Sequence, residues 1–145
     1  MLPGNMPRIF LDTDVAFDII SKREPHFISS LPFLRLAAEG KAMLIISESS
    51  LANLIYLSFG IYKIKEATIL LSDFIGVCEL VHAGKEVSMN ALHSAFKDKE
   101  DALQYYTALH SEVDYFITRN IKDYRKFTDP TLPVYLPGEF FKLVV

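Results

Sequence analysis

The chain has 145 residues, the length of one ordinary domain, and can bury a sizeable apolar core without disulfides. Half of its residues are hydrophobic and only 23% are charged, which excludes disordered, collagen-like and charged-tail proteins. The net charge of −3 does not indicate nucleic-acid binding, so a polyanion would need a local basic patch or a bound cation.

Five short apolar runs have the pattern of buried strands, and they occupy residues 8–12, 41–47, 76–81, 114–118 and 133–136. Helix-length segments cover residues 14–23, 26–39, 48–59, 61–73, 85–95 and 98–111. Strands that alternate with helices form a mainly parallel sheet with helices on both faces. The sequence therefore predicts a three-layer α/β/α sandwich, built as a single domain over residues 1–145 with residues 1–6 as a loose N-terminus.

The surroundings of the protein can be predicted from three further features. No run approaches 18 apolar residues, and the N-terminal stretch lacks the positive start and apolar core of a signal peptide. The lone Cys78 agrees with a reducing compartment. We therefore expect a cytoplasmic protein without a membrane segment.

The mean hydropathy of +0.21 is high for a soluble monomer and predicts a homo-oligomer, most simply a homodimer.

Segment 51–62 is apolar on nearly every side, whereas a surface helix has one polar face. Its apolar side chains recur in two stripes, Leu51, Ile55, Phe59 and Tyr62 in one and Leu54, Leu57 and Ile61 in the other. A single core can cover only one stripe. The sequence therefore predicts that the stripe Leu51, Ile55, Phe59 and Tyr62 is an interface with a second chain.

Acidic residues are expected to gather at one edge of the sheet. Asp12 directly follows the first strand, Asn120 follows the fourth with Asp123 close behind, and Asp98 and Asp101 open the helix before that strand. Ligands of an open parallel sheet bind beyond the carboxyl ends of its strands. Carboxylates gathered there repel one another unless a cation lies among them, and such oxygen ligands suit Mg²⁺ or Mn²⁺. This arrangement favours metal-assisted hydrolysis of phosphodiesters.

Some of these acids also fit purely structural roles. Thr13 or Asp14 is placed to cap the first helix, and Asp98 with Asp101 three residues later has the spacing of a capping box. Asp12 ends a buried strand where no cap is expected, which favours a functional role. The four histidines show no metal-ligand spacing.

A short basic segment lies beside the predicted acidic edge. It contains four cationic residues with two aromatic ones between them, namely Arg119, Lys122, Tyr124, Arg125, Lys126 and Phe127. Cations with interleaved aromatic rings can hold a phosphate backbone and stack bases. The same composition is also typical of a solvated loop.

Four segments together resemble a PIN domain, and their order and spacing cover nearly the whole chain. They are residues 9–15 (IFLDTDV), 98–105 (DKEDALQY), 114–124 (DYFITRNIKDY) and 134–140 (VYLPGEF). The resemblance is to small prokaryotic members with Asp-x-Glu-Asp-Ala and Thr-Arg-Asn-x-x-Asp motifs. It implies a Mg²⁺- or Mn²⁺-dependent ribonuclease that acts on RNA, often the VapC-like toxin of a module in which an antitoxin protein is the partner.

The resemblance assigns roles residue by residue. The first and third acids of the family match Asp12 and Asp101, while the second and fourth fall on Asn53 and Asn120. Each asparagine removes one negative charge, which weakens cation binding, and acids nearby replace part of it. The predicted set is Asp12, Asp98, Asp101 and Asn120 for catalysis, Asp12, Asp98, Asp101 and Asp123 for the metal, and Arg119, Lys122 and Asn53 for RNA.

Two other interpretations remain open at this point. A PIN-fold module that binds RNA or a protein without cutting is favoured by Asn53 and Asn120. A haloacid dehalogenase-like phosphatase is favoured by the Asp-x-Asp-x-Val pattern of residues 12–15, with Asp12 as nucleophile and Asp14 as acid/base. That class also needs a pair of acids after a late strand, where this sequence has Thr118-Arg119-Asn120.

Overall fold

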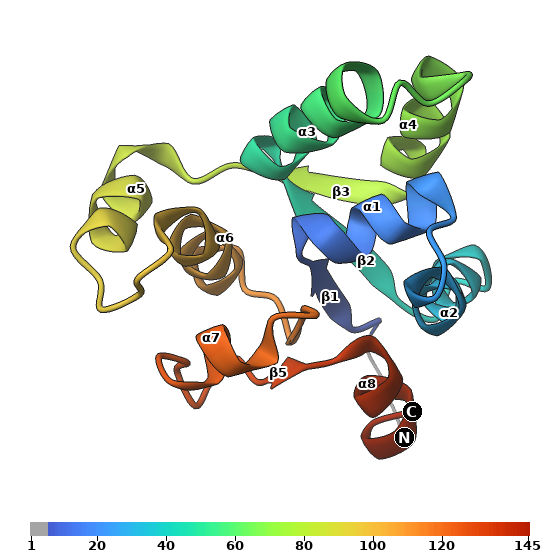
Figure 1. Cartoon of the computed structure of the whole chain (residues 1–145). Helices are drawn as coiled ribbons and strands as arrows, with labels where there is room; N and C mark the ends of the chain where they lie inside the picture. Colours follow the sequence, from blue (N-terminus) through green and yellow to red (C-terminus); the bar gives the residue numbers. More distant parts are fainter. Residues whose placement is uncertain (1–5) are drawn as a thin grey trace.

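Five parallel strands form the central sheet in residues 6–145, the part of the chain that the computed structural model describes (Figure 1). They lie in the order β3-β2-β1-β4-β5. The strands are β1 (Arg8–Leu11), β2 (Met43–Ser47), β3 (Cys78–Val81), β4 (Tyr115–Ile117) and β5 (Val134–Tyr135). Neighbouring strands pair in parallel throughout, which confirms the predicted strands and the parallel sheet.

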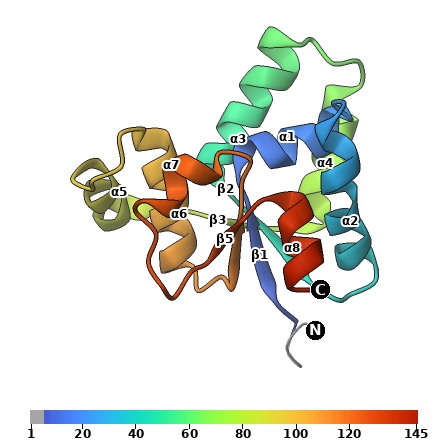
Figure 2. The same ribbon diagram turned by 60° about the horizontal axis from the view of Figure 1, so that its bottom comes forward.

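Helices cover both faces of this sheet and give the predicted three layers (Figures 1 and 2). On one face lie α1 (Thr13–Ser21), α2 (His26–Ala38), α3 (Glu48–Ile55), the π-helix η1 (Tyr56–Ile61), α4 (Ala67–Gly76) and α8 (Pro137–Leu143). On the other lie α5 (Gly84–Leu92), α6 (Lys99–His110) and α7 (Ile121–Arg125). Within residues 6–145, none of these helices is long and apolar enough to span a membrane.

Side chains that alternate between the two faces of the central strand β1 contribute to two separate hydrophobic cores. Ile9 and Leu11 of β1 pack on the α1 side, while Phe10 packs on the α6 side because successive side chains of a strand point to opposite faces. Phe10 stacks on Phe116 of the neighbouring strand β4, with ring centroids 5.2 Å apart. Both faces of the sheet are therefore buried, as the nearly continuous apolar strands predicted.

The helix predictions were less accurate at their ends. The helix expected over 48–59 is α-helical only to Ile55 and continues as η1, and the helix expected over 61–73 begins at Ala67. The sequence prediction missed α7 and α8. Pro137 occupies the first turn of α8, where its missing N–H costs nothing. Residues 1–5 of the predicted loose N-terminus lie outside the described residues, and Met6 is half exposed.

The predicted interface stripe faces outward. Ile55, Phe59 and Tyr62 are each about half exposed, and Leu51 is partly buried. In the other stripe Leu54 is fully buried and Leu57 packs against the core, as expected. Ile61 departs from this pattern because the wider π-turn moves it out of the stripe, leaving it 52% exposed.

Candidate active site

A cavity of about 390 Å³ opens at the carboxyl edge of the sheet. The loop after β1, the first turns of α1 and α6, the α3–η1 segment and the loop after β4 all contribute to it. Its lining residues are Asp12, Thr13, Asp14, Asn53, Tyr56, Leu57, Asp98, Glu100, Asp101, Gln104 and Asn120. All four predicted catalytic residues line this one space, although Asp12 and Asn120 are separated by about three-quarters of the chain.

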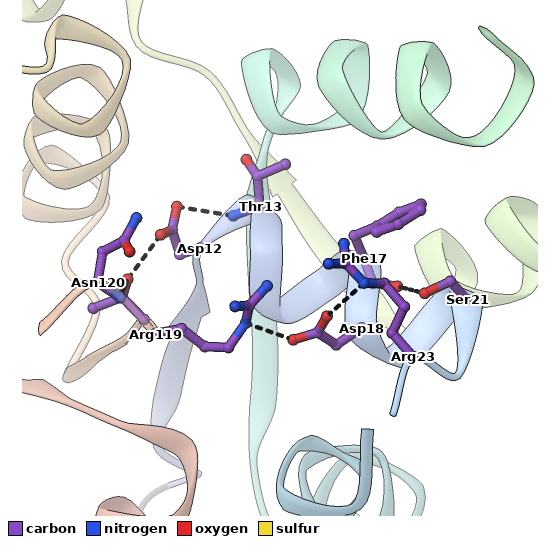
Figure 3. Close-up of polar contacts among 9 residues, drawn as sticks. Asp12, Thr13, Phe17, Asp18, Ser21, Arg23, Arg119 and Asn120 are labelled. Atoms are coloured by element: carbon purple, nitrogen blue, oxygen red, sulfur yellow. Dashed lines mark hydrogen bonds and ion pairs between the residues drawn. The ribbon is translucent and has the colours of Figure 1, made fainter. Parts of the chain in front are cut away.

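Asp12 is buried at the centre of the site and is held from two sides (Figure 3). The backbone N–H of Thr13 donates to its Oδ1 at 2.9 Å, and the hydroxyl of Thr118 donates to its Oδ2 at 2.8 Å. Thr118 in turn accepts the backbone N–H of Asn120 at 3.0 Å. Asp12 is also the N-cap of α1, so the expectation that Thr13 or Asp14 caps this helix was wrong.

The register of the sheet accounts for this contact. Leu11 of β1 lies opposite Ile117 of β4, and the backbone N–H of Asp12 donates to the carbonyl of Ile117 at 2.9 Å. The next residues, Asp12 and Thr118, are consequently brought side by side. Strand pairing between β1 and β4 thus positions the carboxylate of Asp12.

Asp98 and Asp101 come from the start of α6. One carboxylate oxygen of Asp98 accepts the backbone N–H groups of Glu100 at 2.9 Å and Asp101 at 3.1 Å, which confirms Asp98 as a helix cap. The cap sets the first turn of α6 so that the partly buried Asp101 lines the cavity beside Asp12.

The two central carboxyl groups resist ionisation. Burial raises the pKa of Asp12 to about 7, with a further rise from Asp101 and Asp14 and an opposing effect of the Thr118 hydroxyl. Burial, followed by the charge of Asp98, raises the pKa of Asp101 to about 6, and the nearby Tyr124 hydroxyl acts in the opposite direction. A cation bound between them would offset both burial and mutual repulsion.

Gln104 was missed by the sequence prediction. Its amide Nε2 donates to Ser49 at 3.3 Å, and its Oε1 accepts the hydroxyls of Ser47 and Ser50 at the same distance. These bonds join α6 to the start of α3, so the two walls of the cavity are fixed relative to each other. Gln104 lies three residues after Asp101 on the same helix face, and this spacing could have indicated that it belongs to the site.

The other predicted site residues lie around the cavity. Asn53 and the exposed Asn120 line it, whereas Asp123 lines an adjoining cavity of about 160 Å³ that shares Asp98 and Asp101 with the first. Lys122 is exposed on α7 and lines neither space.

Arg119 is engaged in an ion pair within the protein. Its Nε lies 2.8 Å from Oδ2 of Asp18, a fully buried carboxylate on α1 (Figure 3). Nε of Arg23 lies 4.0 Å from the other oxygen of Asp18, and its guanidinium group covers the rings of Phe17 and Tyr62. Burial raises the pKa of Asp18, and the surrounding cations Arg119, His26 and Arg23 act against this shift. Arg119 therefore connects the loop after β4 to α1.

The donor set fits a weakly held magnesium or manganese ion. Within residues 6–145, no three acidic, histidine or cysteine side chains converge into a complete metal centre. Magnesium is commonly bound by one or two carboxylates, with water and substrate phosphates completing its shell. Asp12 and Asp101 supply two such carboxylates, and Asn120 adds an amide oxygen at the same cavity.

Comparison with known proteins agrees with this geometry. The PIN domain family model matches residues 8–122. The chain belongs to the PIN domain family. This membership replaces the haloacid dehalogenase interpretation and confirms the resemblance based on the sequence motifs.

Similar proteins cover nearly the whole chain. Ribonuclease VapC1 of Aquifex aeolicus is 25% identical over 141 residues, which are 94% of each chain. Among solved structures, VapBC2 of Rickettsia felis bound to a promoter DNA fragment has a TM-score of 0.70 at 20% identity, covering 89% of this chain and 98% of that one.

Two further structures share the fold. DNA-bound VapBC of Salmonella typhimurium has a TM-score of 0.68 at 16% identity, covering 91% of this chain and 99% of that one. VapC20 of Mycobacterium tuberculosis, a Sarcin-Ricin loop cleaving toxin, has a TM-score of 0.56 at 13% identity, covering 74% and 86%.

The raised pKa of Asp12 predicts how stability depends on pH. A carboxyl whose pKa is about 7 in the folded protein and 3.8 in the unfolded chain favours folding when protonated. That contribution is complete below pH 4 and is lost as pH rises through 7, by about 4 kcal/mol at most. Metal-free Asp12→Asn, which keeps a capping side chain, should lose less stability between pH 5 and pH 8 than the wild type. Urea unfolding in EDTA measures this difference.

Glu100→Gln serves as the control, because Glu100 is an exposed acid at the same cavity. Its unfolding free energy should follow the wild-type pH curve. If the unfolding free energies of Asp12→Asn and the wild type changed equally with pH, the raised pKa of Asp12 would be contradicted.

Proposed function

We propose that this protein is a divalent-metal-dependent endoribonuclease that acts as the toxin of a toxin–antitoxin module. The observation that carries the proposal is that Asp12 and Asp101 line the same cavity at the carboxyl edge, each with a raised pKa. The names of its relatives support it, because one is a ribonuclease and another is a Sarcin-Ricin loop cleaving toxin.

The chemistry would divide among this chain's own residues as follows. Asp12 and Asp101 would hold a Mg²⁺ or Mn²⁺ ion, with Asp98 and Asp123 adding negative charge nearby. Such an ion, when bound, lowers the pKa of water and offsets charge on phosphate oxygens. The hydroxyl of Thr118 donates to Asp12 and would keep that carboxylate oriented toward the ion. Asn120 and Asn53 present amide groups that can position the phosphate or a water molecule without adding charge.

Binding of the RNA backbone would draw on residues outside the acidic cavity. Lys122 is exposed on α7, which begins directly after the cavity-lining Asn120, and its positive charge would attract the phosphate backbone there. Arg119 is already paired with Asp18, so its main effect on RNA would be to fix the position of Asn120.

The decisive experiment compares RNA cleavage by the wild type, Asp12→Asn and Asp101→Asn across a panel of unstructured and hairpin RNAs, titrated with Mn²⁺. We expect cleavage by the wild type that rises with metal and a loss of at least about 100-fold in each variant, a typical scale for losing transition-state charge stabilisation. Glu86→Gln, an exposed acid on α5, should match the wild type.

A second function is favoured by Asn53 and Asn120, which replace two acids of the family. It is recognition of RNA without cleavage. RNA binding without metal-dependent cleavage, or cleavage that persists in Asp12→Asn, would contradict the proposed nuclease activity. RNA binding alone would support a protein that recognises RNA without cutting it.

The Asn120→Asp variant tests the role of the missing charge. The added carboxylate lines the same cavity as Asp12 and Asp101, so it should tighten metal binding and raise cleavage several-fold at limiting Mn²⁺. The gain should vanish at saturating metal. A rate that falls at every metal concentration would instead show that the amide of Asn120 is itself required.

We also propose a contact between two copies of the chain through the stripe Leu51, Ile55, Phe59 and Tyr62. An antitoxin, the partner present in two of the similar structures, is the other candidate occupant. Ile55→Glu with Phe59→Glu should convert a micromolar dimer to a monomer in sedimentation velocity, because both side chains are about half exposed. Ile28→Glu on α2, 68% exposed, should leave the dimer intact. A monomeric wild type would contradict self-association.

A further inference from the structure

The acidic cavity cannot by itself hold an RNA strand. Apart from Tyr56, every ionisable side chain that lines this cavity is an acid, namely Asp12, Asp14, Asp98, Glu100 and Asp101. A bound cation offsets this charge at the scissile phosphate but not at the phosphates on either side. Groups that hold those neighbouring nucleotides must therefore lie on the rims of the cavity.

One rim carries a single aromatic side chain. Tyr56 lines the cavity, is 61% exposed, and begins the π-helix η1. A Cβ built at Gly60 would lie 3.4 Å from Cδ1 of Tyr56, so the tyrosine ring lies against the bare backbone of that glycine. The π-turn thus presents an exposed ring beside the acids, and π-turns in helices frequently occur at functional sites.

The opposite rim leads into the adjoining cavity. This smaller space shares Asp98 and Asp101 with the acidic cavity and is also lined by Lys97, Lys126 and Phe127. Lys99 is occupied, because its Nζ donates to the carbonyls of Ser94 and Phe96 at 2.9 and 2.7 Å. Lys97 and Lys126 are both exposed and bring positive charge to the edge of the two cavities.

We propose that a single-stranded segment of RNA crosses both cavities, with one base stacked on Tyr56 and a neighbouring phosphate held by Lys97 and Lys126. This inference rests on the proposed function and names its substrate as unpaired RNA. Stacking on Tyr56 requires a base that is free of a duplex, and aromatic rings recognise unpaired bases of any sequence in this way. The two lysines supply the charge that the acidic cavity lacks.

Base stacking on Tyr56 and the phosphate contact with the two lysines should depend differently on salt concentration, so one set of kinetic measurements distinguishes them. KM and kcat for cleavage of a short unstructured RNA are measured with Mn²⁺ at several KCl concentrations. Tyr56→Ala should raise KM roughly tenfold at every salt concentration, leaving kcat within about twofold. Tyr56→Phe should match the wild type because it keeps the ring, and Tyr56→Leu should behave like the alanine variant.

Lys97→Ala and Lys126→Ala should each raise KM most at low salt. Loss of one phosphate contact should reduce the slope of log KM against log[KCl] by about 0.7. Lys41→Ala is the matched control, because Lys41 precedes β2 at the opposite edge of the sheet. Ile61→Ala is the control for Tyr56, because Ile61 is 52% exposed on the same π-helix and lines neither cavity.

An unchanged KM in Tyr56→Ala and Tyr56→Leu would overturn the stacking contact, as would a loss confined to kcat. Unchanged salt slopes in both lysine variants would overturn the phosphate contact. If the wild type binds RNA without cutting it, fluorescence anisotropy gives the same comparisons as Kd values. A wild type that neither binds nor cleaves RNA would instead overturn the proposed function.

Discussion

The site depends on the two hydrogen bonds that hold the buried carboxylate of Asp12. Its oxygens accept from the Thr13 backbone and from the Thr118 hydroxyl, and these partners lie at the ends of adjacent parallel strands. The sheet register alone brings Asp12 and Thr118 together. A one-residue shift of β4 would remove Thr118 from Asp12 and also turn Phe116 from the α6 side of the sheet to the α1 side, so packing and site geometry are fixed by the same constraint.

Three consecutive residues after β4 each connect to a different part of the site. Thr118 binds Asp12 at the start of α1, Arg119 pairs with Asp18 further along α1, and Asn120 lines the cavity. A buried ion pair is costly to form, and removal of one partner leaves an uncompensated charge. The Arg119–Asp18 pair therefore favours one position of this segment over alternatives, and so fixes where Asn120 lies at the cavity.

The sequence was sufficient to predict the sheet and the acidic edge, because both follow from local patterns and from parallel strand geometry. Asp12, Asp98, Asp101 and Asn120 follow or precede regular elements, so topology alone brings them to one cavity. The pairing of Arg119 with Asp18 could not be foreseen, since a buried aspartate in the helical pattern of α1 gives no sign of its partner. Tyr56 was missed because a π-turn changes which side chains share a face, and α7 and α8 because five and seven residues are too few to show a helical period.

The proposed cation site consists of Asp12 and Asp101, whose raised pKa values would be lowered by a bound metal ion. Calorimetric titration with Mn²⁺ at pH 6.5, in two buffers with different heats of ionisation, tests it most directly. With the pKa of Asp12 at about 7, the account predicts weak binding with proton release in the wild type and loss of both in Asp12→Asn. Absence of heat at millimolar Mn²⁺, or heat that is unchanged in Asp12→Asn, would contradict it.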